Sequence, residues 1–290
     1  MKKFCLILSF VFGVTISSYS FECKKVSTQD VLRTIKDKLG IKGVERIEKI
    51  EGGFFEIDIR NRGKKIPVYV DCNLKYLITG QLIDIDKREN ITRKRLAELE
   101  NEAIKEKEIE LVSKIGKEKY KKLKTKFPSR VFNFSFVELK NVPQKGVVVF
   151  GNKNSNKIVY VITDPECPYC ARLHKSIEKV LKTDKNVQFR ILFYPLPFHR
   201  HAKELASAVI CLKDSSEALS TIFNTQKNQS SIKKFASMRC KKGDEILKEH
   251  IKFGESIGVR GTPTIILSNG IMTSGALSPR DLEKLISLLD

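Results

Sequence analysis

Two cysteines separated by two residues stand at the junction of two predicted elements. The stretch "KIVYVIT" (157–163) is β-branched and apolar, as expected of a buried strand. The run "DPECPYCARLHKSIEKVL" (164–181) follows it and carries apolar residues at helical spacing. Cys167 precedes Pro168, and proline is favoured at the first position of a helix. The sequence therefore predicts a strand, a short loop and then a helix that begins at the cysteine pair.

This placement predicts different chemistry for the two thiols. The free N–H groups and the dipole at a helix N-terminus stabilise a thiolate, so we expect a lowered pKa for Cys167. Cys170 lies one turn further along and is shielded by the helix. We therefore predict that Cys167 attacks disulfides and that Cys170 resolves the product. Such a pair has a more oxidising potential than a structural disulfide.

Two alternatives for the pair are a metal site and an inert disulfide. Zinc ligation would need Cys211 and Cys240 as well, but these are much further apart than the two to four residues of a zinc knuckle. A structural disulfide usually closes a longer loop than Cys167–Cys170 would. The "HRH" at 199–201 has no carboxylate at a set spacing and is left unassigned. We predict no metal and no cofactor.

The N-terminus predicts export. Residues 1–20 begin with lysines, continue with an apolar stretch from Phe4 to Val14 and end in small polar residues. This is the layout of a secretory signal peptide. A membrane anchor is the alternative, but the apolar stretch is much shorter than the roughly 20 residues that a spanning helix needs.

Cysteine number alone does not define the disulfides. The chain has seven cysteines, and removing the signal segment takes Cys5 with it. The even number that remains suggests full pairing in an oxidising compartment. Many connectivities are formally possible, so the number of cysteines settles none of them.

The charge raises one further class of partner. A formal net charge of +20 would suit nucleic acid or an anionic membrane surface. However, the lysines are interleaved with glutamates, only 8% of residues are aromatic, and no nucleic-acid signature is present. We predict no nucleic-acid partner.

Residues 21–91 read as a small α+β domain. A helix is predicted over Thr28–Leu39, where Gly40 ends it. "FFEIDIR" (54–60) alternates apolar and charged residues, which predicts a half-buried strand. "IPVYV" (66–70) and "YLITGQLIDI" (76–85) are further strand candidates.

Residues 92–128 differ abruptly in composition. Lysine, arginine and glutamate dominate, and the apolar residues keep an imperfect helical spacing. We predict a solvent-exposed linker helix that is interrupted near Gly116 and stops before Pro128. A disordered charged tether is the alternative.

Residues 129–290 alternate strands with helices. "VVVF" (147–150) and 157–163 are predicted to form a hairpin or to be adjacent strands, and "VQFRILFYPLP" (187–197) is the next strand. A helical insertion is predicted over 201–256, followed by a hairpin around Asn269-Gly270. A final helix begins at Ser278-Pro279, a capping residue followed by proline.

Three stretches of this region resemble one known family. They are "TDPECPYC" (163–170), "AVICLKD" (208–214) and "GVRGTPTIILSNG" (258–270). They resemble the bacterial periplasmic thiol:disulfide interchange proteins of the DsbC/DsbG disulfide isomerase family, and the Pro168-Tyr169 dipeptide is like the DsbG branch. The resemblance implies a C-terminal thioredoxin-like fold with a helical insertion. It also implies that residues 21–91 form a cystatin-like dimerisation domain.

The resemblance implies roles for particular residues. Cys167 and Cys170 would be the catalytic dithiol. Cys211–Cys240 would be a structural disulfide, and Cys23 with Cys72 either a second one or two free thiols. The residues that would support the active site and bind substrate are Pro168, Tyr169, Thr262 and Pro263, with Pro263 in the cis form.

The function implied is isomerisation or reduction of non-native disulfides in the periplasm. The partners would be misoxidised or unfolded exported proteins, a second copy of the chain in a V-shaped homodimer with chaperone capacity, and a membrane thiol reductase of the DsbD type. The alternatives are a monomeric disulfide-donating oxidase like DsbA, a DsbG-like sulfenic acid reductase and a non-catalytic holdase.

Overall fold

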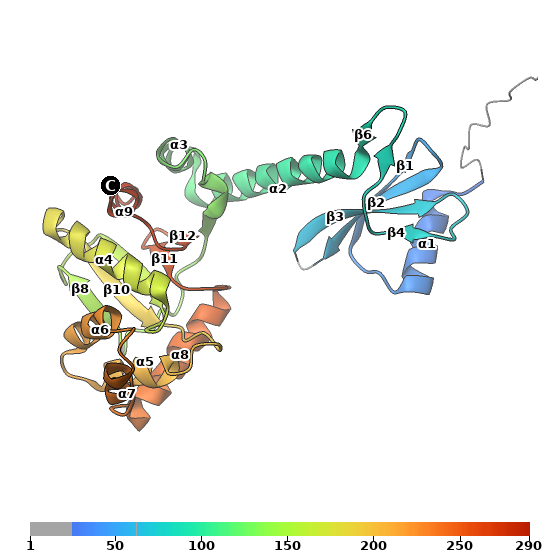
Figure 1. The fold of residues 1–290 in the computed structure, drawn as a ribbon. Helices are drawn as coiled ribbons and strands as arrows, with labels where there is room; N and C mark the ends of the chain where they lie inside the picture. Colours follow the sequence, from blue (N-terminus) through green and yellow to red (C-terminus); the bar gives the residue numbers. More distant parts are fainter. Residues whose placement is uncertain (1–24, 62) are drawn as a thin grey trace, which may run out of the picture. The chain divides into compact units, whose positions relative to one another are not determined.

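The chain divides into two compact units. The computed structural model describes residues 25–61 and 63–290, so the predicted signal segment 1–20 and Cys23 lie outside it. The N-terminal unit runs up to Ala103, and the C-terminal unit is Ile104–Asp290 (Figure 1). The boundary falls within helix α2 (Ile91–Ile115). Domain boundaries at 91 and 128 stay predictions.

The N-terminal unit packs one helix on an antiparallel sheet. Helix α1 (Thr28–Leu39) begins at a capping box between Ser27 and Asp30 and ends at Gly40, as predicted. The strands of the main sheet lie in the order β1-β2-β3-β4. Their bounds and those of a separate pair are β1 (Val44–Ile50), β2 (Phe54–Asn61), β3 (Lys64–Asp71), β4 (Leu77–Ile78), β5 (Ile83–Asp84) and β6 (Glu89–Asn90). Apolar residues of α1, β2 and β3 form the core.

Strand β2 is more buried than its alternating pattern predicts. Glu56 and Asp58 are only 4% and 2% exposed. Arg95 of α2 donates to both oxygens of Asp58 at 3.2 and 2.7 Å, and Arg46 donates to Glu56 at 2.9 Å. The expectation of a half-buried strand is wrong here because arginines cover the polar face and pair with its carboxylates, which is the condition for burying charge.

The charged segment after residue 91 is helical, as predicted. Helix α2 ends at Ile115, and α3 covers Lys117–Lys126. Between them, Gly116 has a φ of 83°, a conformation that glycine adopts most readily. The expectation of a solvent-exposed helix is wrong for part of the segment, because Leu111, Tyr120 and Leu123 are buried in the core of the C-terminal unit.

The C-terminal unit is built on a six-stranded sheet of order β7-β12-β11-β9-β10-β8. Strands β9 and β10 are parallel, and the other neighbours are antiparallel. The expected adjacency of residues 147–150 and 157–163 is wrong, because β10 lies between β8 and β9. The strands are β7 (Ser135–Phe136), β8 (Val148–Gly151), β9 (Ile158–Thr163), β10 (Gln188–Phe193), β11 (Thr264–Leu267) and β12 (Ile271–Ser274).

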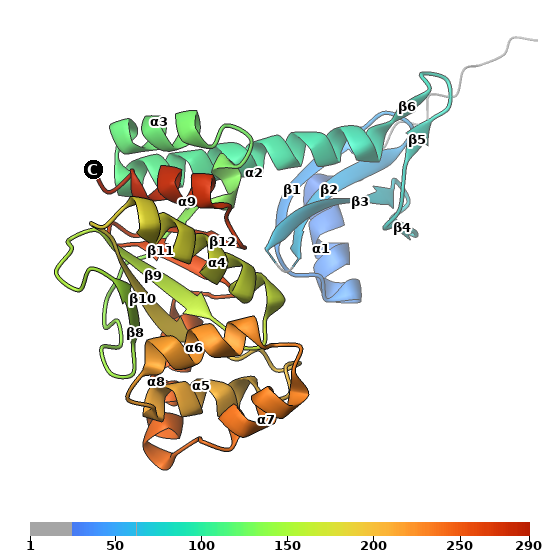
Figure 2. The same cartoon turned by 60° about the vertical axis from the view of Figure 1, so that its left-hand side comes forward.

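Helices cover both faces of this sheet (Figure 2). Val159 and Val161 of β9 belong to the core on the side of α4 and α9, whereas Tyr160 and Ile162 pack with Phe253 of α8 on the other. Successive strand residues thus serve opposite faces. The helices are α4 (Pro168–Thr183), α5 (Ala202–Cys211), α6 (Ser215–Asn224), α7 (Gln229–Ala236), α8 (Lys241–Ser256) and α9 (Pro279–Ile286).

Three local predictions in this unit are confirmed. Helices α5 to α8 form the predicted insertion between β10 and β11. Strands β11 and β12 pair as the predicted hairpin around Asn269-Gly270. Ser278 caps α9 by accepting from the N–H of Asp281 at 3.1 Å. Within residues 25–61 and 63–290, no helix is both long and apolar enough to cross a membrane.

Candidate active site

The cysteine pair stands where β9 passes into α4. Cys167 is the N-cap of α4 and Pro168 is its first residue. The N–H of Cys167 donates to the Asp164 carbonyl at 3.1 Å, and the N–H of Cys170 donates to the Cys167 carbonyl at 3.0 Å. Both thiols are free and buried, at 4% and 2% exposure. The local geometry therefore matches the strand, loop and helix expected from the sequence.

The surroundings of the two sulfurs have opposite effects. A hydrogen bond from the Cys170 thiol, together with the backbone N–H groups of Cys170 and Tyr169, lowers the pKa of Cys167 to about 5 against the opposing effect of burial. Burial raises the pKa of Cys170, and the Cys167 sulfur raises it further. Cys167 is thus the thiol that ionises at neutral pH, and Cys170 stays protonated.

The loop between α8 and β11, which follows the helical insertion in the sequence, completes the site. The Thr262–Pro263 peptide is cis, and the Thr262 carbonyl oxygen lies 3.4 Å from the Cys167 sulfur, where it accepts from the protonated thiol. Since proline has no backbone N–H, Pro263 presents no backbone donor next to this sulfur. The structure thus brings together Cys167, Cys170, Pro168 and the Thr262-Pro263 pair.

A buried carboxylate that sequence reasoning missed braces the loop before Cys167. Asp164 is completely buried and accepts from the N–H groups of Glu166 and Leu196 at 2.8 and 2.7 Å. It also pairs with Nδ1 of His199 at 2.8 Å. Its own N–H donates to the Cys170 sulfur at 3.4 Å. An acidic residue directly after a predicted buried strand could have indicated this role. Its partners Leu196 and His199 lie in the loop after β10, and the sequence alone does not place that loop beside Asp164.

Gln226 holds the same loop from the other side and was also missed. It lies between α6 and α7, and its Nε2 donates to the carbonyls of Pro165 and Cys167 at 2.8 and 3.1 Å. The helical insertion therefore contacts the active-site turn through a specific side chain. A single glutamine in a loop gives no sequence signal for such a role.

Two aromatic side chains are exposed in the segments that form this site. Tyr169 is 54% exposed, and the guanidinium of Arg172 lies 4.8 Å from its ring centre. Phe198 is 75% exposed, and its ring contacts the ring of His199, the partner of Asp164. These rings offer apolar contact area to another molecule.

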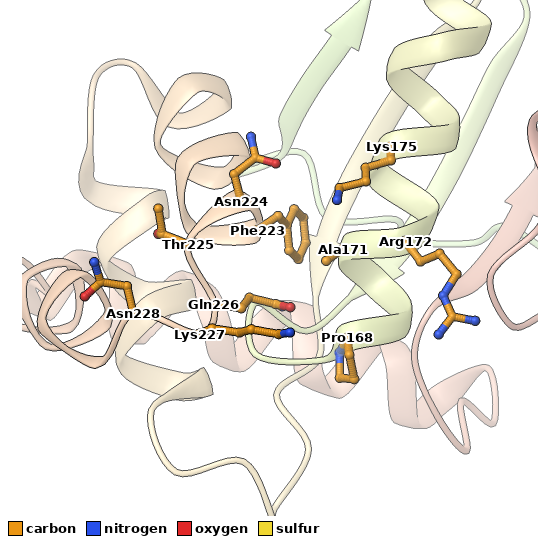
Figure 3. A pocket seen from close by; sticks show the side chains of 10 residues that line it. All are labelled: Pro168, Ala171, Arg172, Lys175, Phe223, Asn224, Thr225, Gln226, Lys227 and Asn228. Carbon is orange, nitrogen blue, oxygen red and sulfur yellow. The ribbon is translucent and has the colours of Figure 1, made fainter.

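A cavity of about 450 Å³ adjoins the start of α4. Pro168 and Ala171 line it from the helix, and residues 223–228 line it from the end of α6 and the following loop (Figure 3).

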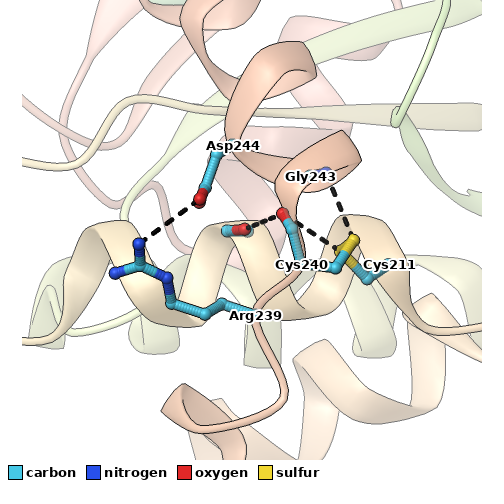
Figure 4. Close-up of a disulfide and its surroundings, with 6 residues drawn as sticks. Cys211, Arg239, Cys240, Gly243 and Asp244 are labelled. Atoms are coloured by element: carbon cyan, nitrogen blue, oxygen red, sulfur yellow. Dashed lines mark hydrogen bonds and ion pairs between the residues drawn. A yellow bond between two sulfur atoms is a disulfide. The ribbon is translucent and has the colours of Figure 1, made fainter.

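The predicted structural disulfide is present in the insertion. Cys211 at the end of α5 is bonded to Cys240 at the N-cap of α8 (Figure 4). Cys72 is also disulfide-bonded and therefore has no free thiol. Because Cys23 lies outside the described residues, its pairing with Cys72 stays a prediction.

One histidine of the active-site helix is buried. His174 of α4 is only 3% exposed. Its Nε2 lies 2.9 Å from the Ser220 hydroxyl, and its ring packs between Phe150 and Phe223. Helix α6 covers this side of α4, and burial lowers the pKa of His174. In the part of the chain that the structure describes, no group of three or more potential ligands is placed to hold a metal.

The fold and the dithiol together define the class of the protein. The model of the thioredoxin-like domain family matches residues 144–289, half of the chain, and the chain belongs to that family. The site described above lies within the matched residues.

Among curated proteins, the chain is similar to members named thiol:disulfide interchange protein DsbC. The Escherichia coli K12 protein is 26% identical over 163 residues, which cover 55% of this chain and 63% of that protein. The Haemophilus influenzae protein is 29% identical over 137 residues, covering 47% and 55%. The chain thus spans less than two thirds of the length of these relatives. Among solved structures, the catalytic domain of Proteus mirabilis ScsC is 21% identical with a TM-score of 0.44, covering 58% of this chain and 99% of that one.

Proposed function

We propose that the protein is a thiol–disulfide oxidoreductase that isomerises or reduces non-native disulfides in exported proteins in the periplasm. The observation that carries the proposal is the placement of the two thiols, with Cys167 at the N-cap of α4 and Cys170 buried one turn into the helix. Cys167 is poised as a thiolate at neutral pH, and Cys170 is a protonated thiol one turn away. A thiolate is the nucleophile in disulfide exchange, and a protonated neighbour is available for the second step.

The proposed reaction begins with attack by the Cys167 thiolate on one sulfur of a substrate disulfide. A mixed disulfide forms as the substrate S–S bond breaks, and the other substrate sulfur leaves as a thiolate. In isomerisation, a different substrate thiolate attacks the mixed disulfide and releases Cys167 with no net change in oxidation state. In reduction, Cys170 loses its proton and attacks Cys167, so the substrate gains two electrons and the protein is oxidised.

The remaining residues support these steps. Pro168 starts the helix whose N–H groups stabilise the thiolate, and Pro263 keeps a backbone donor away from it. The exposed ring of Tyr169 and the backbone at Thr262 would contact the client chain. Re-reduction of Cys167–Cys170 needs a dithiol donor, for which a membrane reductase of the DsbD type is the proposed partner.

The proposal extends to assembly and export. A homodimer through residues 21–91 would hold two active sites near one unfolded client, and removal of residues 1–20 would accompany export. The dimer follows from the resemblance to the DsbC/DsbG family, and export follows from the layout of residues 1–20. The proposed clients are misoxidised exported proteins because only unfolded chains expose wrongly paired cysteines.

The test uses two single substitutions in the full chain. Cys167→Ser should abolish refolding of scrambled ribonuclease, because the remaining Cys170 is a buried, protonated thiol. Cys170→Ser should instead accumulate mixed disulfides that gel electrophoresis without reductant reveals. Equal behaviour of the two variants would contradict the assigned roles. Mass mapping of protein taken from the periplasm separates the alternatives, since an isomerase keeps Cys167–Cys170 reduced and a disulfide-donating oxidase keeps it oxidised.

A further inference from the structure

The cavity beside α4 lies next to the nucleophile and is fixed to it. Pro168, the residue after Cys167, lines its wall, and so does Gln226, whose amide donates to the Cys167 carbonyl at 3.1 Å. A group bound in this cavity is therefore held close to the Cys167 turn. We call this cavity the α4–α6 pocket, and no step of the thiol chemistry described above uses the space inside it.

The α4–α6 pocket has a cationic lining without counter-charges. Lys175 from α4 and Lys227 from the loop after α6 extend into the space between these two elements (Figure 3). Arg172 is directed away from that space in the same view and stacks on Tyr169. No aspartate or glutamate lines the pocket, and among the described residues neither lysine has an ion pair.

The other lining groups suit a carboxylate on a peptide. The side-chain amide of Asn224 adds a hydrogen-bonding group, and Phe223 contributes an apolar surface. The volume of about 450 Å³ exceeds the need of a single small anion and fits a short peptide segment. A pair of exposed charges contributes at most about 1 kcal/mol, too little to retain a free anion. This free energy is enough for a client segment that is already tethered to Cys167, because tethering raises the effective concentration of the segment at the pocket.

We infer that the α4–α6 pocket binds an acidic side chain of the client polypeptide close to the cysteine that Cys167 attacks. This inference rests on the proposed function and adds a substrate preference to it. Disulfides flanked by aspartate or glutamate are then attacked faster than the same disulfides flanked by amides.

The test compares two peptide disulfides that differ only in glutamate or glutamine on either side of the cysteine. Each rate of reduction by the full-length reduced protein is divided by the rate of the same peptide with dithiothreitol, which removes intrinsic differences in reactivity. At low salt we expect the acidic peptide to be favoured about two- to tenfold, from two exposed ion pairs. The preference should shrink at about 0.5 M salt, where surface charges are screened.

The double variant Lys175→Glu/Lys227→Glu should abolish or invert the preference, measured as the ratio of the rates with the two peptides. The matched control, Lys179→Glu/Lys182→Glu, changes the net charge equally at exposed positions of α4 outside the pocket and should keep the preference. No preference in the natural protein, or equal loss in both double variants, overturns the inference. Failure of the natural protein to reduce the glutamine peptide instead overturns the proposed function.

Discussion

Cys167 and Cys170 differ in reactivity because of a few groups around each sulfur. Cys167 receives a thiol donor and helix-start N–H groups, whereas the interior around Cys170 disfavours a charge. The helix start was predictable from Cys167-Pro168, and so was the direction of the pKa shift. The buried donor from Cys170 was not, because its burial depends on packing by other segments.

The lowered pKa of Cys167 predicts its alkylation profile. In the reduced protein, the iodoacetamide reaction rate of Cys167 should rise with pH and reach half its maximum near pH 5, because the thiolate is the reacting form. An ordinary cysteine would do so near about pH 8.5. Peptide mass mapping at graded pH gives the rate of each cysteine. In Cys170→Ser the midpoint should change, since the thiol donor is replaced, and a midpoint near 8.5 in the natural protein would refute the assignment.

Asp164 organises the loop that carries the dithiol, and its substitution should be costly. In Asp164→Asn, an amide N–H₂ replaces one acceptor oxygen, so the partly buried N–H of Glu166 or Leu196 loses its partner. Such a loss costs about 1–3 kcal/mol. Chemical denaturation should show this loss, while Glu255→Gln at an exposed position should leave stability nearly unchanged. Equal stability of the two variants would show that Asp164 does not brace the loop.

At the scale of elements, α5 and α8 approach each other closely at the Cys211–Cys240 disulfide. A Cβ added at Gly243 of α8 would lie 2.4 Å from the Ser207 carbonyl oxygen and 2.5 Å from the Cys211 sulfur. Figure 4 shows Gly243 beside this disulfide. The two helices can pack at this distance because position 243 has no side chain.

Gly243→Ala should therefore destabilise the C-terminal unit. Because the clash involves backbone rather than the end of a flexible side chain, the helices must separate, at a cost of about 1–3 kcal/mol. The measurement is the melting temperature of the oxidised protein. Gly80→Ala is the matched control, since an added Cβ there meets nothing within 4 Å. A melting temperature lowered as much by Gly80→Ala as by Gly243→Ala would contradict the packing argument.

The elements that could be predicted are encoded by sequence signals within a few residues. The wrong predictions concern contacts between segments that are distant in the sequence. The capped starts of α1 and α9 and the turn at Asn269-Gly270 are encoded within a few residues. The place of β10 between β8 and β9 depends on a crossover through α4, which strand patterns do not report. The burial of Glu56 and Asp58 likewise depends on arginines that come from other elements.

At the scale of the whole molecule, the charged helices belong partly to the core that carries the dithiol. Leu123 is completely buried, and Tyr120 and Phe127 are 7% and 4% exposed in the same cluster as Cys167. The sequence of α3 did not indicate this apolar face, because its lysines outnumber the residues that pack in the core. Apolar residues of α3 therefore pack in the same core as the dithiol.

Two fragments test both this packing and the proposed dimer. The fragment 104–290 keeps the buried residues of α3 and should fold, react at Cys167 and sediment as a monomer, because residues 21–91 are the proposed dimer interface. The fragment 128–290 loses Leu123 and its neighbours and should be less stable by several kcal/mol, since deleting even one buried leucine side chain costs about 2–5. Full-length protein should sediment as a dimer. Dimeric 104–290 would move the interface into the C-terminal unit, and equal stability of the two fragments would show that α3 adds nothing to the core.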